Sequence, residues 1–327
     1  MRRSFKAVAT AFAAAALLGV AACSGGATPD PGGSGSAPAG GEKYAIVLKV
    51  LSSEFWQKME QGAKEKATEL GVTLDVVAAN SEDDIEGQVS LAENLLDQGY
   101  TGIGVAPLTA DNLVNVVAKA TAKGTPVINI DEKINMDALK AANGAVIGFI
   151  TTDNVAVGAK GAGFIVEQLG SAGGQVAIIE GKAGTASGEA RKQGATEAFT
   201  AAAGVELVDS QPADWDRTKA FDLATNYISK YPDLKAIYCA NDTMAMGAQE
   251  AVAQSGRTIL VVGTDGNADA VESVNAGGLA ATVAQDSAGI GAKAVEDLVA
   301  FVKSGAKFDA STVSQETFID SILVTKS

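Results

Sequence analysis

From Lys43 onward, short apolar runs alternate with longer amphipathic stretches. Runs such as Tyr44 to Leu48 and Val127 to Ile130 are almost continuously apolar, which is typical of strands buried on both faces of a sheet. The stretches between them have the spacing of apolar residues that an amphipathic helix requires. Because parallel strands are joined by long crossovers that usually contain a helix, this alternation predicts an α/β fold of doubly wound parallel sheets.

The alternation runs twice along the chain, which suits two domains because the chain has 327 residues and a domain takes about 150. Gly71 and Gly124 are expected to end two of the helices. The expected strands are residues 44–48, 73–78, 102–105, 127–130 and 146–150, then 175–179, 205–210, 236–239, 260–263 and 280–283. The expected helices are residues 56–70, 83–98 and 110–123, then 154–169, 188–202, 216–229, 242–254, 268–275 and 287–303. The sequence therefore predicts two five-stranded parallel sheets, each covered by helices on both faces.

The first residues have the pattern of a secretory signal. A basic start is followed by an apolar stretch, Ala7 to Val20, that is too short to cross a bilayer. The small residues before Cys23 resemble a bacterial lipobox, which implies cleavage after residue 22 and a lipid on Cys23. Residues 23–42 are rich in Gly, Pro and Ser and are expected to form a flexible tether. We therefore expect a lipid-anchored protein on the extracellular face of the cell membrane, or in the periplasm of a cell with an outer membrane.

Composition excludes several classes of function. The chain has no histidine, which excludes the Ser/His/Asp and Cys/His catalytic arrangements and imidazole metal ligands. It has only two cysteines, too few for a thiolate zinc cluster. Its formal net charge of −14 argues against nucleic acid as a partner. We expect a protein that is not an enzyme and has no catalytic residue, metal or cofactor.

Polar and aromatic side chains follow the expected strands where those strands end. Ligands of doubly wound sheets bind outside the carboxyl ends of the strands, so these side chains are candidates for a binding site. Charged and amide groups can hydrogen-bond hydroxyls, and aromatic faces pack on the CH faces of a sugar ring, so the set predicts a monosaccharide site. The candidates are Lys49, Ser53, Phe55, Trp56, Asp131, Glu132, Arg191, Trp215, Asn241, Asp265 and Gln285.

Several segments carry a resemblance to a known family, among them YAIVLKVLSSEFW, EGKAGTASGEAR, SQPADWDR, AIYCANDTMAMG and VVGTDG. Together they resemble the ribose-binding type of periplasmic sugar receptors of bacterial ABC transporters, in the branch that binds D-allose. The resemblance covers nearly all of residues 43–326. It implies the type I periplasmic binding fold, with two lobes joined by three crossings near Thr151, Asp286 and Thr317. One lobe would take residues 43–151 and 286–316, and the other residues 152–285 and 317–327.

The resemblance also implies roles for the candidates. Phe55, Trp56 and Trp215 would stack on the sugar. Lys49 and Glu132 agree with the pattern of the D-allose receptors, whereas Ser53 stands where relatives carry Asn. The expected hydrogen-bonding residues are Lys49, Asp131, Arg191, Asn241, Asp265 and Gln285. The expected partners are D-allose and the permease subunits of the transporter.

Other interpretations stay open at this point. D-psicose, D-ribose or another hexose or pentose could be the ligand, and the receptor could serve a membrane sensor. Lys49 and Glu132 could instead form a solvated ion pair, and Asp131 and Asp265 could be helix N-caps. The same two aspartates could serve a glycosidase. A sugar-sensing repressor shares the fold, but the signal and tether occupy the place of its DNA-binding domain.

Overall fold

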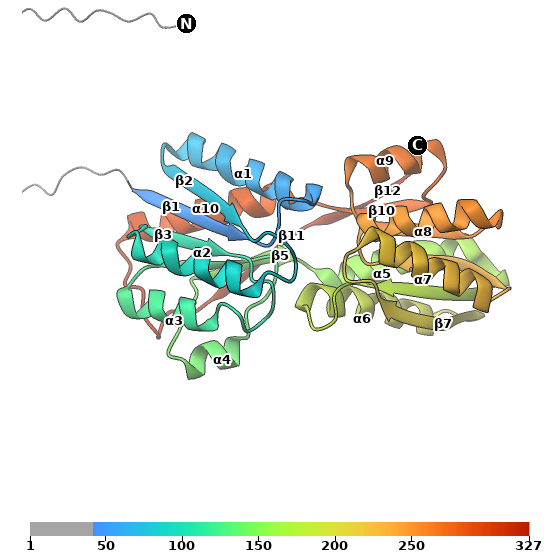
Figure 1. The fold of residues 1–327 in the computed structure, drawn as a ribbon, viewed down its shortest axis with the longest axis horizontal. Helices are drawn as coiled ribbons and strands as arrows, with labels where there is room; N and C mark the ends of the chain where they lie inside the picture. Colours follow the sequence, from blue (N-terminus) through green and yellow to red (C-terminus); the bar gives the residue numbers. More distant parts are fainter. Residues whose placement is uncertain (1–41, 327) are drawn as a thin grey trace, which may run out of the picture. The chain divides into compact units, whose positions relative to one another are not determined.

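The computed structural model describes residues 42–326. The expected signal peptide, Cys23 and the tether up to residue 41 lie outside these residues. The described residues form two lobes, and a six-stranded sheet lies at the centre of each (Figure 1). None of the helices described here is both long enough and apolar enough to cross a membrane.

The first lobe is built on a wholly parallel sheet with the strand order β11-β5-β4-β3-β1-β2. Its strands are β1 (Lys43–Leu48), β2 (Thr73–Ala78), β3 (Gly102–Val105), β4 (Val127–Ile130), β5 (Gly148–Thr152) and β11 (Gln315–Ile319). Its helices are α1 (Glu54–Leu70), α2 (Ile85–Asp97), α3 (Val114–Lys123), α4 (Met136–Ala141) and α10 (Ser287–Ser304). Gly71 and Gly124 end α1 and α3 with φ of 68° and 71°, a left-handed conformation that glycine adopts without strain, as the sequence predicted.

The second lobe has the strand order β12-β10-β9-β8-β6-β7, and only β12 runs antiparallel to its neighbour. Its strands are β6 (Gly174–Glu180), β7 (Val205–Pro212), β8 (Leu234–Cys239), β9 (Leu260–Asp265), β10 (Ala281–Gln285) and β12 (Ser321–Thr325). Its helices are α5 (Asn154–Leu169), α6 (Ala186–Ala201), α7 (Arg217–Lys230), α8 (Asp242–Ser255), α9 (Ala268–Ala276) and the short 3₁₀ helix η1 (Gly170–Ala172).

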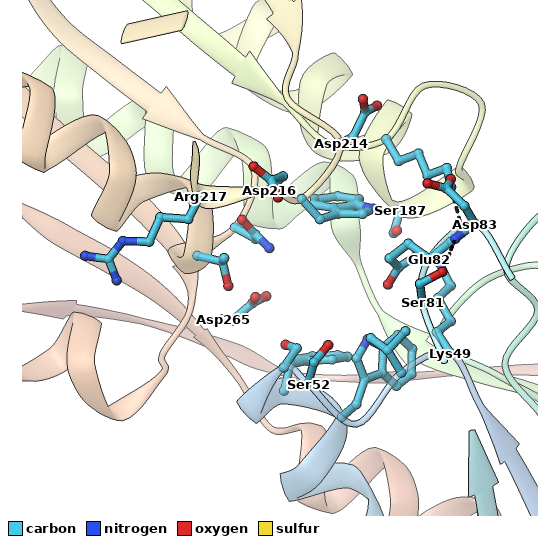
Figure 2. Close-up of a pocket in the computed structure, with 18 of the residues that line it drawn as sticks. Lys49, Ser52, Ser81, Glu82, Asp83, Ser187, Asp214, Asp216, Arg217 and Asp265 are labelled. Atoms are coloured by element: carbon cyan, nitrogen blue, oxygen red, sulfur yellow. Dashed lines mark hydrogen bonds and ion pairs between the residues drawn. The ribbon is translucent and has the colours of Figure 1, made fainter. Parts of the chain in front are cut away.

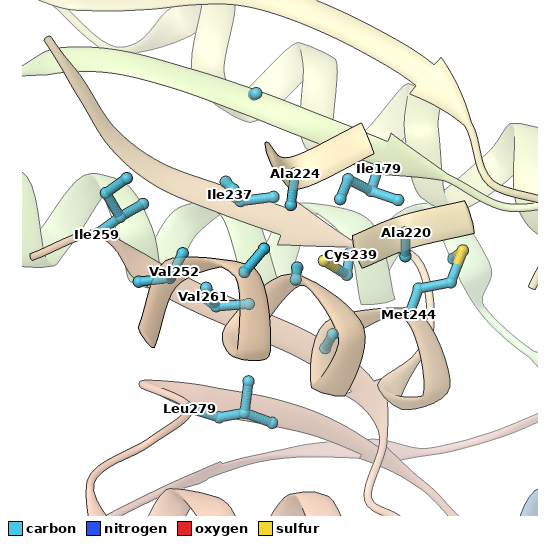
Figure 3. Close-up of a cluster of buried hydrophobic side chains, with 14 of the residues drawn as sticks. Ile179, Ala220, Ala224, Ile237, Cys239, Met244, Val252, Ile259, Val261 and Leu279 are labelled. Carbon is cyan, nitrogen blue, oxygen red and sulfur yellow. The ribbon is translucent and has the colours of Figure 1, made fainter. Parts of the chain in front are cut away.

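Each sheet is buried on both faces. On β8, Ile237 and Cys239 pack with α7 and α8 on one face, whereas Ala236 and Tyr238 pack with the residues of α5 and α6 on the other. Figure 3 shows the first of these cores, with Cys239 among aliphatic side chains. Alternate residues of a strand point to opposite faces, so a strand covered by helices on both sides must be apolar throughout. This is the physical reason for the continuous apolar runs in the sequence.

The prediction of five strands in each sheet was wrong, because β11 is a sixth strand of the first sheet and β12 is a sixth strand of the second. Both are edge strands whose residues are largely exposed or half-buried, so they lack the apolar run that marks the others. The prediction that both sheets are wholly parallel was also wrong for the second sheet, since β12 pairs antiparallel with β10.

The chain passes between the two sheets at Asp153, Asp286 and Asp320, each of which separates an element of one lobe from an element of the other. The family resemblance implied the third crossing near Thr317, and in the structure this crossing lies three residues later, at Asp320. Pairing of β11 with β5 continues to Ile319, and β12 begins two residues later. A turn of the chain at Asp320 therefore carries it directly from one sheet to the other (Figure 1).

Candidate functional site

A cavity of about 570 Å³ lies between the two lobes, where the carboxyl ends of strands from both sheets face each other. In Figure 2, Lys49 and Ser52 of the first lobe and Asp265 and Asp216 of the second surround the same space. A small-molecule site in a protein commonly has this size and position. All the predicted site residues except Glu132 and Gln285 line this cavity.

The first lobe contributes a buried cation and two aromatic rings. Lys49 directly follows β1, and its side chain is only 3% exposed. Its Nζ lies 3.0 Å from Glu132 Oε2 and 5.9 Å from the centroid of the Trp56 ring. Phe55 and Trp56 begin α1 and meet edge to face, with ring centroids 5.1 Å apart. The alternative of a solvated Lys49–Glu132 ion pair is therefore wrong, because both partners are buried.

The second lobe contributes a buried network around Arg191. The Nε of this α6 residue donates to Asn154 Oδ1 at 2.8 Å, and its Nη1 donates to the Ala240 carbonyl at 2.7 Å. Nη1 also lies 3.4 Å from Oδ1 of Asp265, the last residue of β9. The guanidinium carbon lies 5.7 Å from the centroid of the Trp215 ring. These contacts hold the charge of Arg191 at the cavity wall in one orientation.

The predicted residues outside the wall support those that form it. Gln285 Nε2 donates to Asp265 Oδ1 at 2.7 Å. Glu132 accepts from Lys49, and its side chain has no exposed surface. Asn241, which was predicted as a ligand contact, also caps α8, where its Oδ1 accepts from the Met244 N–H at 2.9 Å. Asp131 and Asp265 do not begin a helix.

Several buried oxygen atoms in the site have no hydrogen-bond partner within residues 42–326. Asp131 Oδ1 and Glu82 Oε2 belong to residues of the cavity wall, and Gln285 Oε1 belongs to the residue that supports Asp265. A buried polar atom without a partner is costly, so each of these atoms requires an explanation. Asp131 Oδ1 and Glu82 Oε2 can each accept a hydrogen bond, and a bound molecule rich in hydroxyl groups would supply the donors.

Burial dominates the electrostatics of these carboxyl groups. It raises the pKa of Asp131 to about 7, against the opposing charges of Lys49 and Arg191. It likewise raises the pKa of Asp265 to about 6, with Arg191 opposing it, and it raises the pKa of Glu82. Burial disfavours the charged form of Lys49, but the carboxyl groups of Glu132, Glu82 and Asp131 together raise its pKa. Perturbed pKa values of this kind gather at functional sites.

The backbone of the cavity wall is strained. Non-glycine residues with positive φ in the described chain are Asp131 (58°), Asn143 (57°), Asp214 (52°), Trp215 (65°) and Asp265 (120°). All of them except Asn143 line the cavity. Positive φ costs free energy for residues with a side chain and tends to occur where function requires it. The four residues lie at or just after the carboxyl ends of β4, β7 and β9.

Two sets of hydrogen bonds on the rim join the lobes across the cavity. Lys182 Nζ of the second lobe donates to Asp83 Oδ1 at 2.5 Å and to the Glu82 carbonyl at 2.6 Å. Elsewhere on the rim, the Glu54 carboxylate accepts from the Ala268 N–H at 3.0 Å, and Lys58 Nζ donates to the Gly266 carbonyl at 3.2 Å. The lobes are therefore closed on each other in this structure.

Residues 44–307 match the family described as the periplasmic binding protein domain. The chain belongs to the periplasmic binding protein family. This periplasmic binding protein is 55% identical over 286 residues to the D-allose-binding periplasmic protein of Escherichia coli, covering 87% of this chain and 92% of the relative. It is 34% identical over 257 residues to the ribose import binding protein of Bacillus subtilis, covering 78% and 80% of the two chains.

Solved structures of the family share the fold. A periplasmic solute binding protein of Actinobacillus succinogenes, solved with bound D-allose, has a TM-score of 0.81 and 32% identity. The alignment covers 87% of this periplasmic binding protein and 97% of that structure. The myo-inositol binding protein of Caulobacter has a TM-score of 0.75 and 27% identity, with 89% and 96% covered. The α/β fold class and the resemblance to this family, both predicted from the sequence, are confirmed.

Sequence reasoning missed part of the cavity wall of this periplasmic binding protein. Asn80, Ser81 and Glu82 follow the carboxyl end of β2, from which the sequence analysis selected no candidate. Lys182 and Ser187 lie in the glycine-rich segment after β6, from which only Arg191 was selected. Inspection of every strand end would have found these residues. No group of three or more His, Cys, Asp or Glu residues in the described range could hold a metal ion.

Proposed function

We propose that the chain is the solute receptor of an ABC sugar importer, which captures a monosaccharide by closure of its lobes and delivers it to the permease. D-allose is the first candidate. The observation that carries this proposal is the cavity wall, which combines aromatic rings with buried carboxyl oxygen atoms that have no partner within residues 42–326. A sugar supplies hydroxyl donors for the oxygen atoms and CH faces for the rings.

Each part of the wall has a role in this proposal. Asp131 and Asp265 accept hydrogen bonds from sugar hydroxyls, and Lys49 and Arg191 donate to sugar oxygen atoms. Such charge-assisted hydrogen bonds are stronger than neutral ones and fix the orientation of the ligand. Asn241 and Ser53 add polar contacts, and Gln285 holds Asp265 in position. Phe55 and Trp56 pack on the sugar from the first lobe, and Trp215 packs from the second.

The choice of D-allose rests on the relatives and on Lys49. The Escherichia coli relative is named for D-allose, and the Actinobacillus structure contains it. Lys49 brings a buried ammonium into the wall, and a buried donor discriminates strongly against ligands that leave it without a partner. A hexose offers one more hydroxyl than a pentose. D-psicose, D-ribose and other hexoses or pentoses are the alternatives.

We also propose that the protein acts outside the cytoplasm, held to the membrane by a lipid on Cys23. The support is the signal-like pattern of residues 1–22 and the Gly- and Pro-rich segment that follows Cys23. As a flexible coil, that segment would let the sugar-binding part turn toward the permease. Delivery to a membrane sensor instead of a permease remains the alternative for the partner.

Isothermal titration calorimetry tests the ligand. The purified protein is unfolded and refolded to remove carried-over sugar, then titrated with D-allose, D-psicose, D-ribose, D-galactose and D-xylose. We expect D-allose to bind with a dissociation constant of about 1 μM or lower, which corresponds to about −8 kcal/mol. Tighter binding of another sugar would support the proposed receptor function but contradict D-allose as the ligand. No binding across the panel would overturn the proposed function.

The anchor has a separate test. Cells that express the full chain are grown with a radiolabelled fatty acid, and membranes are separated from soluble protein. We expect label on the membrane-bound protein and none on the Cys23→Ser variant, which also stays at its unprocessed mass. A wild-type protein without label would contradict the lipid anchor and leave the sugar-binding proposal unaffected.

A further inference from the structure

The helices of the second lobe differ in how their N-termini are capped. At α5, α7 and α8, a side chain of the same lobe accepts from the first turn of the helix; these caps are Asp153, Asp216 and Asn241. At α6 and α9 the N-cap residues are Thr185 and Asn267, and neither side chain caps its helix. Thr185 instead donates its hydroxyl to the Lys182 carbonyl at 2.7 Å. The second lobe by itself therefore lacks a side-chain cap on two of its helices.

Glutamates of the first lobe cap these two helices. Glu132 Oε1 accepts from the backbone N–H groups of Ala186 and Ser187, the latter at 3.3 Å. Glu132 Oε2 accepts from the Ser187 hydroxyl at 2.8 Å. Glu54 does the same for α9 through the Ala268 N–H. A carboxylate at a helix N-terminus is stabilising, because it satisfies free N–H groups and meets the positive end of the helix dipole.

Glu132 differs from Glu54 because it is also tied to the cavity. Its Oε2 accepts from Lys49 Nζ at 3.0 Å, and Lys49 lines the cavity. The four hydrogen bonds to Glu132 come from Lys49, Ala186 N–H, Ser187 N–H and the Ser187 hydroxyl. A carboxylate can accept about four hydrogen bonds, so these four bonds occupy all the acceptor positions of Glu132. Glu132 has no exposed surface and is absent from the cavity wall.

We propose that Glu132 is a positioning residue that couples recognition of a ligand hydroxyl by Lys49 to closure of the lobes on helix α6. The inference rests on the proposed function of the cavity. Lys49 has three N–H donors, and the bond to Glu132 leaves others for the ligand. A ligand oxygen that accepts from Lys49 fixes the ammonium, which holds the Glu132 carboxylate facing α6. When the lobes close, Glu132 completes the cap of α6. When they open, water replaces Glu132 at the N-terminus of that helix.

The test compares Glu132→Gln with the wild-type full chain. Stopped-flow fluorescence with the tightest sugar of the panel gives the rate constants, and small-angle X-ray scattering at saturating sugar reports closure. Because the variant loses hydrogen bonds that the carboxylate made in the closed state, we expect sugar to dissociate about 10- to 100-fold faster. At saturating sugar, we also expect the radius of gyration of the variant to be larger than that of the wild type. The association rate constant should change little, since the sugar associates before the lobes close.

A matched control and a double variant separate coupling from general damage. Glu316→Gln removes a glutamate that pairs with Lys133 on the surface of the same lobe, and it should bind and close like the wild type. The double variant Lys49→Met with Glu132→Gln should lose less affinity than the sum of the two single losses, because residues that act as a unit are not additive. If unpaired Lys49 prevents Glu132→Gln from folding, Glu132→Asp keeps the charge but draws it back from α6, and faster dissociation is again expected.

The outcomes distinguish the two proposals. A wild-type protein that binds none of the sugars overturns the proposed function and the coupling with it. A wild-type protein that binds sugar, with a Glu132→Gln variant that closes and dissociates like it, overturns the coupling alone. Additive losses in the double variant also overturn it, because they would mean that Glu132 acts on the sugar independently of Lys49.

Discussion

Lys182 of the second lobe reaches Asp83 of the first lobe at the rim of the cavity, with Nζ and Oδ1 2.5 Å apart. Lys182 follows β6 and Asp83 precedes α2, so the two belong to different lobes and meet only when the lobes are closed. The Lys182 side chain is 19% exposed and the Asp83 side chain 89% exposed. The ion pair therefore lies in water on one side and is open to screening by salt.

We predict that Lys182→Met makes sugar dissociate about two- to fivefold faster at low salt, the modest effect expected of an exposed ion pair. The variant also loses the bond from Lys182 to the Glu82 carbonyl. The difference from the wild type should shrink as salt rises. Stopped-flow measurements at two salt concentrations check this. Lys230→Met, which removes an exposed partner of Asp209 within the second lobe, should not change dissociation. A salt-independent effect of Lys182→Met would contradict the prediction.

Gly158 of α5 sets the position of the helix that carries Arg191. A Cβ atom on Gly158 would lie 2.0 Å from the Arg191 carbonyl oxygen, so α5 and α6 can approach as they do only because this residue lacks a side chain. We predict that Gly158→Ala destabilises the protein by about 1–3 kcal/mol through overpacking and weakens sugar binding by displacing Arg191. Thermal denaturation and calorimetric titration measure the two effects.

Gly163 provides the matched control in the same helix. A Cβ atom there would meet nothing within 4 Å. Gly163→Ala should therefore raise stability by up to about 1 kcal/mol, since alanine favours a helix more than glycine does, and leave sugar binding unchanged. Equal effects of the two substitutions would show that helix propensity, and not the contact with Arg191, decides the outcome at Gly158.

Sugar affinity should depend on pH through Asp131, whose pKa is raised to about 7 by burial. Sugar hydroxyls that donate to its carboxylate favour the charged form, so the bound pKa is lower than the free pKa and binding releases a proton. Affinity is then full above about pH 7 and falls by up to about tenfold for each pH unit below it. Titrations between about pH 5 and pH 8, in buffers with different ionisation enthalpies, measure both the affinity and the released proton.

The Asp131→Asn variant should bind sugar more weakly at neutral pH, and its affinity should depend much less on pH. Asp265, whose pKa is raised to about 6, should leave a smaller pH dependence of the affinity. An affinity that increased on acidification would show that protonated Asp131 is the form that binds.

Much of the fold could be predicted from local patterns. The expected strands at residues 73–78, 102–105 and 127–130 coincide with β2, β3 and β4. β3 and β4 are buried along their whole length, as their apolar runs predicted, whereas β2 is a half-buried edge strand. The strand expected at residues 146–150 lies two residues later, as β5, because Thr151 and Thr152 continue the strand as buried polar residues that the apolar pattern does not include. β11 and β12 were missed for a similar reason: as half-exposed edge strands they have no apolar run.

Nine of the eleven site residues that the sequence predicted lie in the cavity wall, because the carboxyl ends of parallel strands gather at one edge of a sheet. It did not reveal how Glu132 is used. Residue type and position suggested a ligand contact, whereas its oxygen atoms are directed to Lys49 and to the N-terminus of α6. Nothing in the local sequence around Glu132 identifies a helix that begins 54 residues later as its partner.

The sequence by itself determined the α/β class, the two series of strands and the strand ends that supply polar groups, because each depends on hydrophobic periodicity and short-range chain geometry. Only the tertiary structure decided which groups are satisfied and which are not. The partners of Glu132, the unpaired oxygen of Asp131 and its raised pKa depend on two lobes meeting across the cavity. Burial and hydrogen bonding between distant residues arise from packing, and no local stretch of sequence specifies them.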